Sequence, residues 1–182
     1  MEELELEKTY LARYLPEGLW GCEHLELTDL YIPEKAEHPK LRIRQKGDRF
    51  EITKKTPLVE GDSSQQTEQT IPLLETEFRA LEKIPGKKVR KVRYLYDFAG
   101  YKAEIDVFKD ELAGLVLVDF EFSTVEKMKE FKMPEFCLVD VTQEEFLAGG
   151  MLCGKKYADI ENKLKEFGYK KIAGYIQTLR TI

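Results

Sequence analysis

The sequence predicts an α+β fold in which eight β-strands form a barrel, with charged faces inside and helices packed on the outer face. Three observations predict it. Eight segments alternate apolar and charged residues, which is typical of strands with two unlike faces. The charges are sorted by strand, with basic pairs on some strands and acidic pairs on others. Segments with helical spacing carry apolar stripes that need an apolar sheet face to pack on.

The first strand lies close to the N-terminus. Glu5, Glu7 and Thr9 share one face, because side chains two residues apart in a strand point the same way. Leu6 and Tyr10 occupy the opposite face, which is suited to a core. This strand therefore predicts a carboxylate face on one side and an apolar face on the other.

The other candidate strands follow the same rule. They cover residues 25–32, 41–45, 49–55, 66–71, 89–98, 101–108 and 114–123. The turn at residues 46–48 contains a glycine between two alternating arms, which indicates a hairpin. Residues 56–65 contain proline, glycine and serine, which predicts a loop before the fifth strand.

Helical spacing predicts helices over residues 74–84, from 124 onward, over 157–167 and over 172–179. Ser123 or Thr124 is the expected N-cap of the second of these, and Pro134 is expected to break it. Residues 140–145 suggest an extended piece leading into a short helix. The length predicts one domain, residues 1–182, with the helices from about residue 153 capping or packing on the barrel.

Composition excludes several function classes. The net charge of −5 argues against nucleic-acid binding, which usually brings an excess of Lys and Arg. The three cysteines have no metal-type spacing, which favours a reduced cytoplasmic protein. The sequence has no secretory signal and no apolar run long enough to span a bilayer, so no membrane partner is expected. A homodimer is left open.

The charged faces allow two interpretations. One is an open antiparallel sheet whose charged side faces bulk water. The other is a barrel with a charged lumen, which the sorting of charges favours because solvated faces tend to mix signs. The basic pairs are Arg42 with Arg44 and Lys91 with Arg93; the acidic pairs are Glu5 with Glu7, Glu104 with Asp106, and Asp119 with Glu121.

A lumen of this kind suits one class of ligand. Arg and Lys neutralise phosphate oxygens, and Arg can do so with two parallel hydrogen bonds. Clustered carboxylates repel one another without cations, and oxygen ligands select Mg²⁺ or Mn²⁺, which bridge phosphates. The pattern therefore predicts a metal–polyphosphate site. His24 and His38 are expected at loops or strand ends rather than as ligands.

The ordered motifs resemble the CYTH superfamily, the triphosphate tunnel metalloenzymes. Residues 5–11 (ELEKTYL) are similar to its N-terminal Glu-x-Glu-x-Lys signature. Later matches are LRIR (41–44), ITKK (52–55), KVRY (91–94), EIDVF (104–108), GLV (114–116), DFEF (119–122) and DVT (140–142). The resemblance covers roughly residues 3–152. It implies a closed eight-stranded antiparallel tunnel that binds a triphosphate-bearing small molecule together with Mg²⁺ or Mn²⁺.

The resemblance also implies residue roles. The residues expected to bind triphosphate are Arg42, Arg44, Lys55, Lys91 and Arg93, with strand parity favouring Lys55 over Lys54. The residues expected to bind metal are Glu5, Glu7, Glu104, Asp106, Asp119 and Glu121, with Glu121, Glu5 and Glu7 the first choices. Glu51 and Glu68 are further candidate ligands or ion-pair partners within the tunnel.

One position departs from the family pattern. In register with the catalytic Glu5 and Glu7, the signature lysine falls on Thr9, whereas Lys8 should point to the other face. In the family that lysine is associated with substrate contact or attack by water. Three functions therefore stay open: a metal-dependent hydrolase of inorganic or organic triphosphate, a CYTH-type adenylate cyclase, and a non-catalytic triphosphate-binding module.

Overall fold

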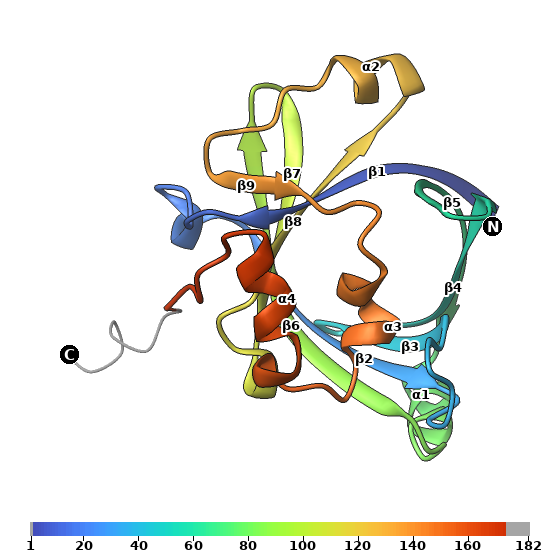
Figure 1. The fold of residues 1–182 in the computed structure, drawn as a ribbon. Coiled ribbons are helices and arrows are strands. Elements are labelled where there is room, and N and C mark those ends of the chain that lie inside the picture. Colours follow the sequence, from blue (N-terminus) through green and yellow to red (C-terminus); the bar gives the residue numbers. More distant parts are fainter. Residues whose placement is uncertain (1, 174–182) are drawn as a thin grey trace.

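A computed structural model of the 182-residue chain describes residues 2–173 (Figure 1). The strands are β1 (Glu2–Ala12), β2 (His24–Ile32), β3 (Leu41–Lys46), β4 (Arg49–Val59), β5 (Asp62–Leu73), β6 (Lys87–Phe98), β7 (Tyr101–Phe108), β8 (Val116–Phe122) and β9 (Cys137–Asp140). The helices are η1 (Leu19–Gly21), α1 (Glu75–Leu81), η2 (Asp110–Leu112), α2 (Val125–Glu130), η3 (Glu145–Leu147), α3 (Gly149–Leu152) and α4 (Tyr157–Glu166).

The strands form one antiparallel sheet that closes on itself. Its order is β5-β4-β3-β2-β6-β7-β8-β1-β9, and an additional pairing joins β5 to β1. Closure uses the first half of β1, where Leu4 lies opposite Thr67 of β5. The short β9 pairs with the far end of β1, where Tyr10 lies opposite Asp140. The predicted eight-stranded closed barrel is confirmed, and β9 adds a ninth strand outside the ring.

One prediction about local structure needs correction, and a second falls mostly outside the described residues. The loop expected over residues 56–65 is wrong, because β4 continues to Val59 and β5 begins at Asp62. Thr56 and Thr67 form a cross-strand pair there, and the turn is made by Gly61 with a positive φ of 84°. The residues expected to be a helix over 172–179 lie outside the described part of the chain, apart from 172 and 173.

The outer face of β1, β6, β7 and β8 carries the main apolar core. Tyr10, Ile105, Val118 and Phe120 are buried there, and Met128 of α2 packs on the same cluster. Thr124 caps α2 by accepting a hydrogen bond from the backbone N–H of Lys127, as predicted. These apolar residues alternate with the charged ones along each strand, so packing the outside turns the charged side chains inward.

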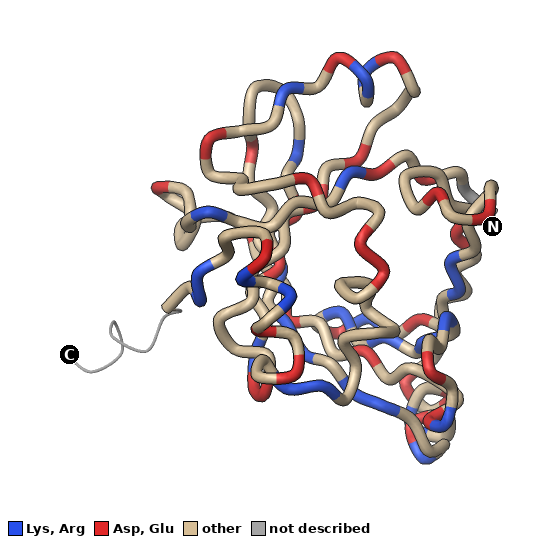
Figure 2. The backbone as a smooth tube through the Cα atoms, viewed as in Figure 1, with Lys and Arg blue, Asp and Glu red and all other residues tan. Residues whose placement is uncertain are grey.

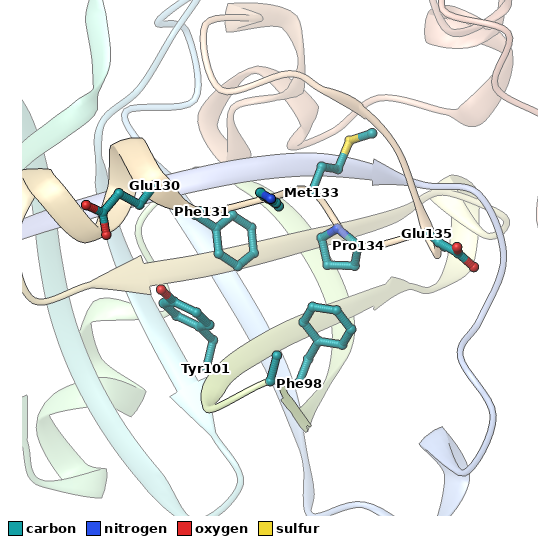
Figure 3. A pocket seen from close by; sticks show the side chains of 9 residues that line it. Phe98, Tyr101, Glu130, Phe131, Met133, Pro134 and Glu135 are labelled. Carbon is teal, nitrogen blue, oxygen red and sulfur yellow. The ribbon is translucent and has the colours of Figure 1, made fainter.

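An aromatic pocket lies at the outer edge of this core (Figure 3). Phe98 and Tyr101 come from the β6–β7 hairpin, and Phe131 comes from the segment after α2. The rings of Tyr101 and Phe131 meet edge to face, with centroids 4.9 Å apart. The pocket has a volume of about 360 Å³ and is separate from the barrel interior. The segment after α2 therefore packs against the β6–β7 hairpin through these rings.

On the opposite side of the barrel, α1 covers the outer face of β2, β3 and β4. Its buried Phe78 packs in a cluster with Leu30 and Ile43, and its ring lies 4.8 Å from that of Phe50. Helices therefore pack on the outside of the sheet in two places, as predicted. No helix within residues 2–173 is both long and apolar enough to cross a membrane.

A third apolar cluster lies at one end of the barrel. It joins inward-facing strand residues, such as Leu11, Val89 and Leu117, to Phe146 and Leu147 of η3. Helix α4 contributes Tyr157, Ile160 and Leu164 to the same cluster. The inner faces are therefore charged along most of each strand and become apolar at this end.

Candidate active site: a tunnel with acidic and basic walls

The interior of the barrel is a cavity of about 810 Å³ lined by residues from all eight strands of the ring. Every residue predicted for the site lines it: Glu5, Glu7, Thr9, Arg42, Arg44, Lys55, Lys91, Arg93, Glu104, Asp106, Asp119 and Glu121. Figure 2 shows the charged positions on the strands around the opening. Glu51 and Glu68 line it too. The structure thus brings the predicted site residues together in one place.

Arg93 of β6 is the centre of one ion-pair cluster. Its guanidinium donates to Asp106 at 2.8 and 2.7 Å and also contacts Glu104, while Asp119 lies 3.6 Å away. Lys91 contacts the same Asp106. Burial opposes ionisation of Asp106, but Arg93 and Lys91 outweigh it and hold the pKa of Asp106 well below its usual range. Asp106 is thus ionised and paired with the side chains of Lys91 and Arg93.

Lys55 of β4 is the centre of a second cluster. Its ammonium contacts Glu5, lies 3.3 Å from Glu7 and lies 3.6 Å from Glu68. Burial disfavours the charged form of Glu7, yet Lys55, Arg93 and Lys91 together lower the pKa of Glu7 below its usual value. The lysine thus links β4 to its neighbour β5 and to the next strand of the ring, β1. Lys55 rather than Lys54 lines the cavity, in agreement with the parity argument.

Arg44 of β3 is held by a residue that the sequence did not single out. Its Nε and Nη2 donate to the two carboxylate oxygens of Asp29 at 2.6 and 2.8 Å. Both side chains are buried, and they face each other across the β2–β3 pair. Despite burial, Arg44 holds the pKa of Asp29 well below its usual range. This fork-to-fork pair fixes the orientation of Arg44.

Arg42 has a different environment from Arg44. Its Nη1 donates to the Tyr31 hydroxyl at 3.3 Å, and its Nη2 lies 3.6 Å from Glu68. Within the described residues its buried Nε has no hydrogen-bond partner. A buried guanidinium N–H without an acceptor is costly, so this donor is suited to an oxyanion of a ligand.

Comparison with characterised proteins identifies the family. A scan against family models finds no match. The chain is 30% identical over 143 residues to an inorganic triphosphatase of Nitrosomonas europaea, covering 78% of this chain and 91% of that protein. It also matches the crystal structure of the inorganic triphosphatase NE1496 with 26% identity and a TM-score of 0.62, covering 83% of this chain and 95% of that one. The chain belongs to the CYTH superfamily.

In this CYTH protein the third signature position is a threonine, as the sequence indicated. Thr9 lines the tunnel opposite Asp119 of β8. Its backbone N–H donates to Thr142 Oγ1 at 3.1 Å, and its carbonyl accepts from the Val141 N–H at 2.8 Å. Lys8 lies opposite Phe120, which belongs to the outer core, so its ammonium is on the other side of β1.

The acidic wall of this CYTH protein provides the donor chemistry for a divalent cation. Glu7 lies opposite Glu121 in register, and Glu104 lies opposite Asp119. Burial, followed by the charges of Glu7 and Asp106, raises the pKa of Asp119 to about 7. Burial and the charges of Glu104 and Glu7 likewise raise the pKa of Glu121. Carboxylates crowded to this extent are stabilised by a hard cation.

The ligand geometry, in contrast, is not preformed. Among the described residues no three His, Cys, Asp or Glu side chains are already grouped as a metal site. The carboxylates instead engage Lys55, Lys91 and Arg93. The residue types therefore fit a divalent cation, and the ion pairs would have to open to admit it.

Other residues of the cavity were missed at the level of sequence. They include Asp29, Tyr31, His38, Lys40, Lys46, Thr142 and Glu144. Asp29 carried a signal, because it is an acidic residue on the strand face that it shares with Leu27 and Tyr31. His38 lies in the β2–β3 connection, as predicted, and pairs with Glu145 at 2.8 Å. The match at residues 140–142 singled out the start of this segment, but no pattern in residues 143–150 indicated that they would reach the cavity.

Proposed function

We propose that this protein hydrolyses inorganic triphosphate, using a divalent cation, Mg²⁺ or Mn²⁺, held by the acidic wall of the tunnel. The observation that carries the proposal is the meeting of five basic and six acidic predicted site residues in one cavity. The kinship with an inorganic triphosphatase of Nitrosomonas europaea supports the choice of substrate. An organic triphosphate is the alternative within the same reaction class.

The basic residues would bind the phosphate oxygens. Arg42 offers its unpaired Nε, and Lys55 and Arg93 would exchange their carboxylate partners for phosphate oxygens. Lys91 would add charge beside Asp106. Asp29 already accepts hydrogen bonds from Nε and Nη2 of Arg44, so only the remaining N–H groups of Arg44 could bind phosphate. In this arrangement Arg42 is the principal clamp and Arg44 a fixed supporting charge.

The acidic residues would hold the cation, with Glu5, Glu7 and Glu121 as principal ligands and Glu104 and Asp119 beside them. Asp106 is less suited, because Lys91 and Arg93 already engage it. A bound divalent cation supplies charge neutralisation at the phosphoryl oxygens. Filling the acidic wall with a cation would also release Lys55 and Arg93 toward the substrate.

The reaction is a displacement at the terminal phosphorus. A water oxygen forms a bond to that phosphorus, and the bond from phosphorus to the bridging oxygen breaks. The products are orthophosphate and pyrophosphate, and the proton lost by water goes to the products or solvent. The protein's share is to position the triphosphate and to stabilise the charge of the transition state with Arg42, Lys55 and Arg93.

A non-catalytic triphosphate-binding module is the second candidate, and Thr9 is the observation that favours it. The residue opposite Asp119 has no ammonium group, so no lysine on β1 is available there to assist attack by water. In that case the charged tunnel would bind triphosphate without turnover. The cytoplasm is the proposed compartment, because all three cysteines are free thiols and two of them are buried.

The test is an assay of phosphate release with a panel of triphosphates. Tripolyphosphate, ATP and other nucleoside triphosphates are each incubated with Mg²⁺, Mn²⁺ or a chelator. The proposal expects metal-dependent orthophosphate from tripolyphosphate. Thermal stabilisation by tripolyphosphate without turnover would support the binding module instead. Cyclic AMP and pyrophosphate from ATP would support the adenylate cyclase alternative.

A further inference from the structure

One mouth of the tunnel is crossed by a segment that we call the strap, residues 141–150. It begins after β9, passes through η3 and enters α3 (Figure 1). Its first residues are fastened to β1, because Val141 donates to the Thr9 carbonyl and Thr142 accepts from the Thr9 N–H. Most strap residues line the cavity, including Gln143, Glu144 and Leu147. The strap therefore forms an end wall of the tunnel.

Polar contacts hold the middle of the strap against two loops at the rim of the mouth. Gln143 accepts a hydrogen bond from the Ser63 N–H at 2.9 Å and donates to Asp62 at 3.0 Å, both at the tip of the β4–β5 hairpin. Glu145 pairs with His38 of the β2–β3 connection at 2.8 Å. The strap therefore runs from β1, past the β4–β5 hairpin that neighbours β1 in the ring, to the β2–β3 connection, and so crosses the mouth.

Two glycines seat the end of the strap on the barrel. A Cβ atom at Gly149 would lie 2.1 Å from the Tyr31 hydroxyl, and one at Gly150 would lie 2.1 Å from the Pro39 carbonyl oxygen. Only a residue without a side chain permits so close an approach. Phe146 and Leu147, between the polar contacts and the glycines, are buried in the apolar cluster at this end of the barrel.

The opposite mouth is built differently. The described residues that line the cavity there come from strands alone, namely Lys46 of β3, Glu51 of β4, Glu104 of β7 and Glu121 of β8. Their side chains are charged. At the strap end the inward strand residues Leu11, Val89 and Leu117 are apolar, and the strap and its neighbouring loops add charged residues such as Lys40 and Glu144. A polyanion accompanied by cations is attracted to the charged mouth, whereas at the other end the strap and the apolar side chains beneath it stand in its path.

We propose that the tunnel is blind: a phosphate chain enters only end-first through the charged mouth, and the strap stops it from threading through. This inference rests on the proposed function. It adds the direction in which the substrate enters the tunnel. An enzyme of this kind shortens a linear polyphosphate from its ends and does not cut it internally. It also requires one free terminal phosphate on any organic triphosphate, whose organic group stays outside the charged mouth.

The chemistry of each turnover is unchanged by chain length. Water bonds to a phosphorus near the inserted end, the bond to one bridging oxygen breaks, and a short phosphate leaves a chain shortened by the same number of units. The fate of the remaining chain distinguishes a blind tunnel from an open one. Internal cleavage would produce long fragments, and cleavage from the end would not.

The experiment compares two linear polyphosphates of the same mean length, one with free ends and one with both terminal phosphates amidated, in the presence of Mg²⁺ or Mn²⁺. The blind tunnel predicts release of short phosphates from the free-ended chain, and at least about 100-fold slower cleavage of the blocked chain, since a misplaced reacting group loses that much rate. Comparable cleavage of the two, with long fragments on a gel, would overturn the inference.

Loosening the strap provides a second readout. The double variant His38→Ala/Gln143→Ala removes both polar fastenings and should yield long fragments from the blocked chain. The matched control is His24→Ala/Gln69→Ala, because His24 and Gln69 are exposed and away from the strap; it should behave as wild type. Gly149→Val is a stronger variant, since its side chain collides with Tyr31.

The two proposals fail separately. If the wild type does not hydrolyse tripolyphosphate, the proposed function is wrong. If tripolyphosphate is hydrolysed and the wild type cuts the blocked chain as fast as the free one, only the blind tunnel is wrong. A wild type that spares the blocked chain, with strap variants that also spare it, would assign the selectivity to something other than the strap and overturn its role.

Discussion

The two ends of the tunnel are built from the same strands and have opposite chemistry. On β1 the inward residues run from Glu5 and Glu7 through Thr9 to Leu11, which is fully buried. On β8 the inward Glu121 and Asp119 are followed toward the strap by Leu117, which is buried as well. Two positions further along a strand, the inward side chains are thus no longer suited to metal and phosphate but to packing. We expect function to concentrate at the charged end and stability at the apolar end.

The largest expected effect comes from Asp29→Asn. It would weaken the division between the two ends, because here a charged residue of the cavity contributes to stability. Asp29→Asn leaves the buried Arg44 without its anion, which is expected to lower the free energy of unfolding by about 3–5 kcal/mol. The pKa of Asp29 is lowered in the folded state, so its stabilisation is present above the ordinary carboxyl pKa. The difference between wild type and variant should therefore shrink as the pH falls below about 4. Urea unfolding at pH 7 and at acidic pH measures it.

Arg42→Ala would sharpen the comparison from the side of function. Arg42 offers an unpaired buried donor to the ligand, so its loss should lower kcat/KM for tripolyphosphate by about 10²–10³-fold, as for other groups that stabilise transition-state charge. Thermal stabilisation by tripolyphosphate should disappear as well. Arg79→Ala is the matched control, since Arg79 is exposed on α1, outside the tunnel, where it pairs with Glu75 and Glu82 and lies over the Phe50 and Phe78 rings. An unchanged thermal shift in Arg42→Ala would contradict the binding role.

Leu117→Ala tests the apolar end. Leu117 is buried among the residues beneath the strap, and truncating it should lower the free energy of unfolding by about 2–4 kcal/mol through lost burial and a residual cavity. Chemical denaturation measures the loss. Once the fraction of folded enzyme is corrected for, kcat with tripolyphosphate should change far less than in Arg42→Ala. A larger loss of kcat than of stability would mean that the apolar end takes part in catalysis.

Thr9→Lys gives the smallest expected effect. The new ammonium would lie opposite Asp119, whose pKa is raised to about 7 mainly by burial. If the missing lysine limits turnover, kcat should rise by about tenfold, corresponding to roughly 1.4 kcal/mol of transition-state stabilisation. Thr9→Met, which has a similar length and no charge, is the control. Equal rates in wild type and Thr9→Lys would show that this position does not limit hydrolysis.

Much of the fold and the site could be predicted from the sequence, because strand alternation fixes which side chains share a face. Parity placed Glu5, Arg93 and Lys55 in the tunnel, and each lines it. The extension of β4 and β5 was missed because Pro57 and the glycine and serine residues are typical of loops. Asp29 was missed because its significance depends on Arg44, a partner fifteen residues away on the next strand.

The strap could not be predicted for a further reason. Its seat depends on contacts between Gly149 and Tyr31 and between Gln143 and Ser63, which are distant in sequence and have no periodic signature. An ion pair within the tunnel was expected only for Glu51 or Glu68, and Glu68 does pair with Lys55 and Arg42; the pairs made by the predicted metal ligands were not expected, since sorted charges suggested separate roles for acids and bases. In the folded chain Lys55 and Arg93 neutralise carboxylates on nearby strands of the ring.

The measurement that tests the account most directly is the stoichiometry of tripolyphosphate hydrolysis by the wild-type protein. With Mg²⁺ or Mn²⁺ we predict equal amounts of orthophosphate and pyrophosphate, no release in excess chelator, and loss of activity in Arg42→Ala. A protein that is stabilised by tripolyphosphate and releases no phosphate with either metal would contradict the proposed function.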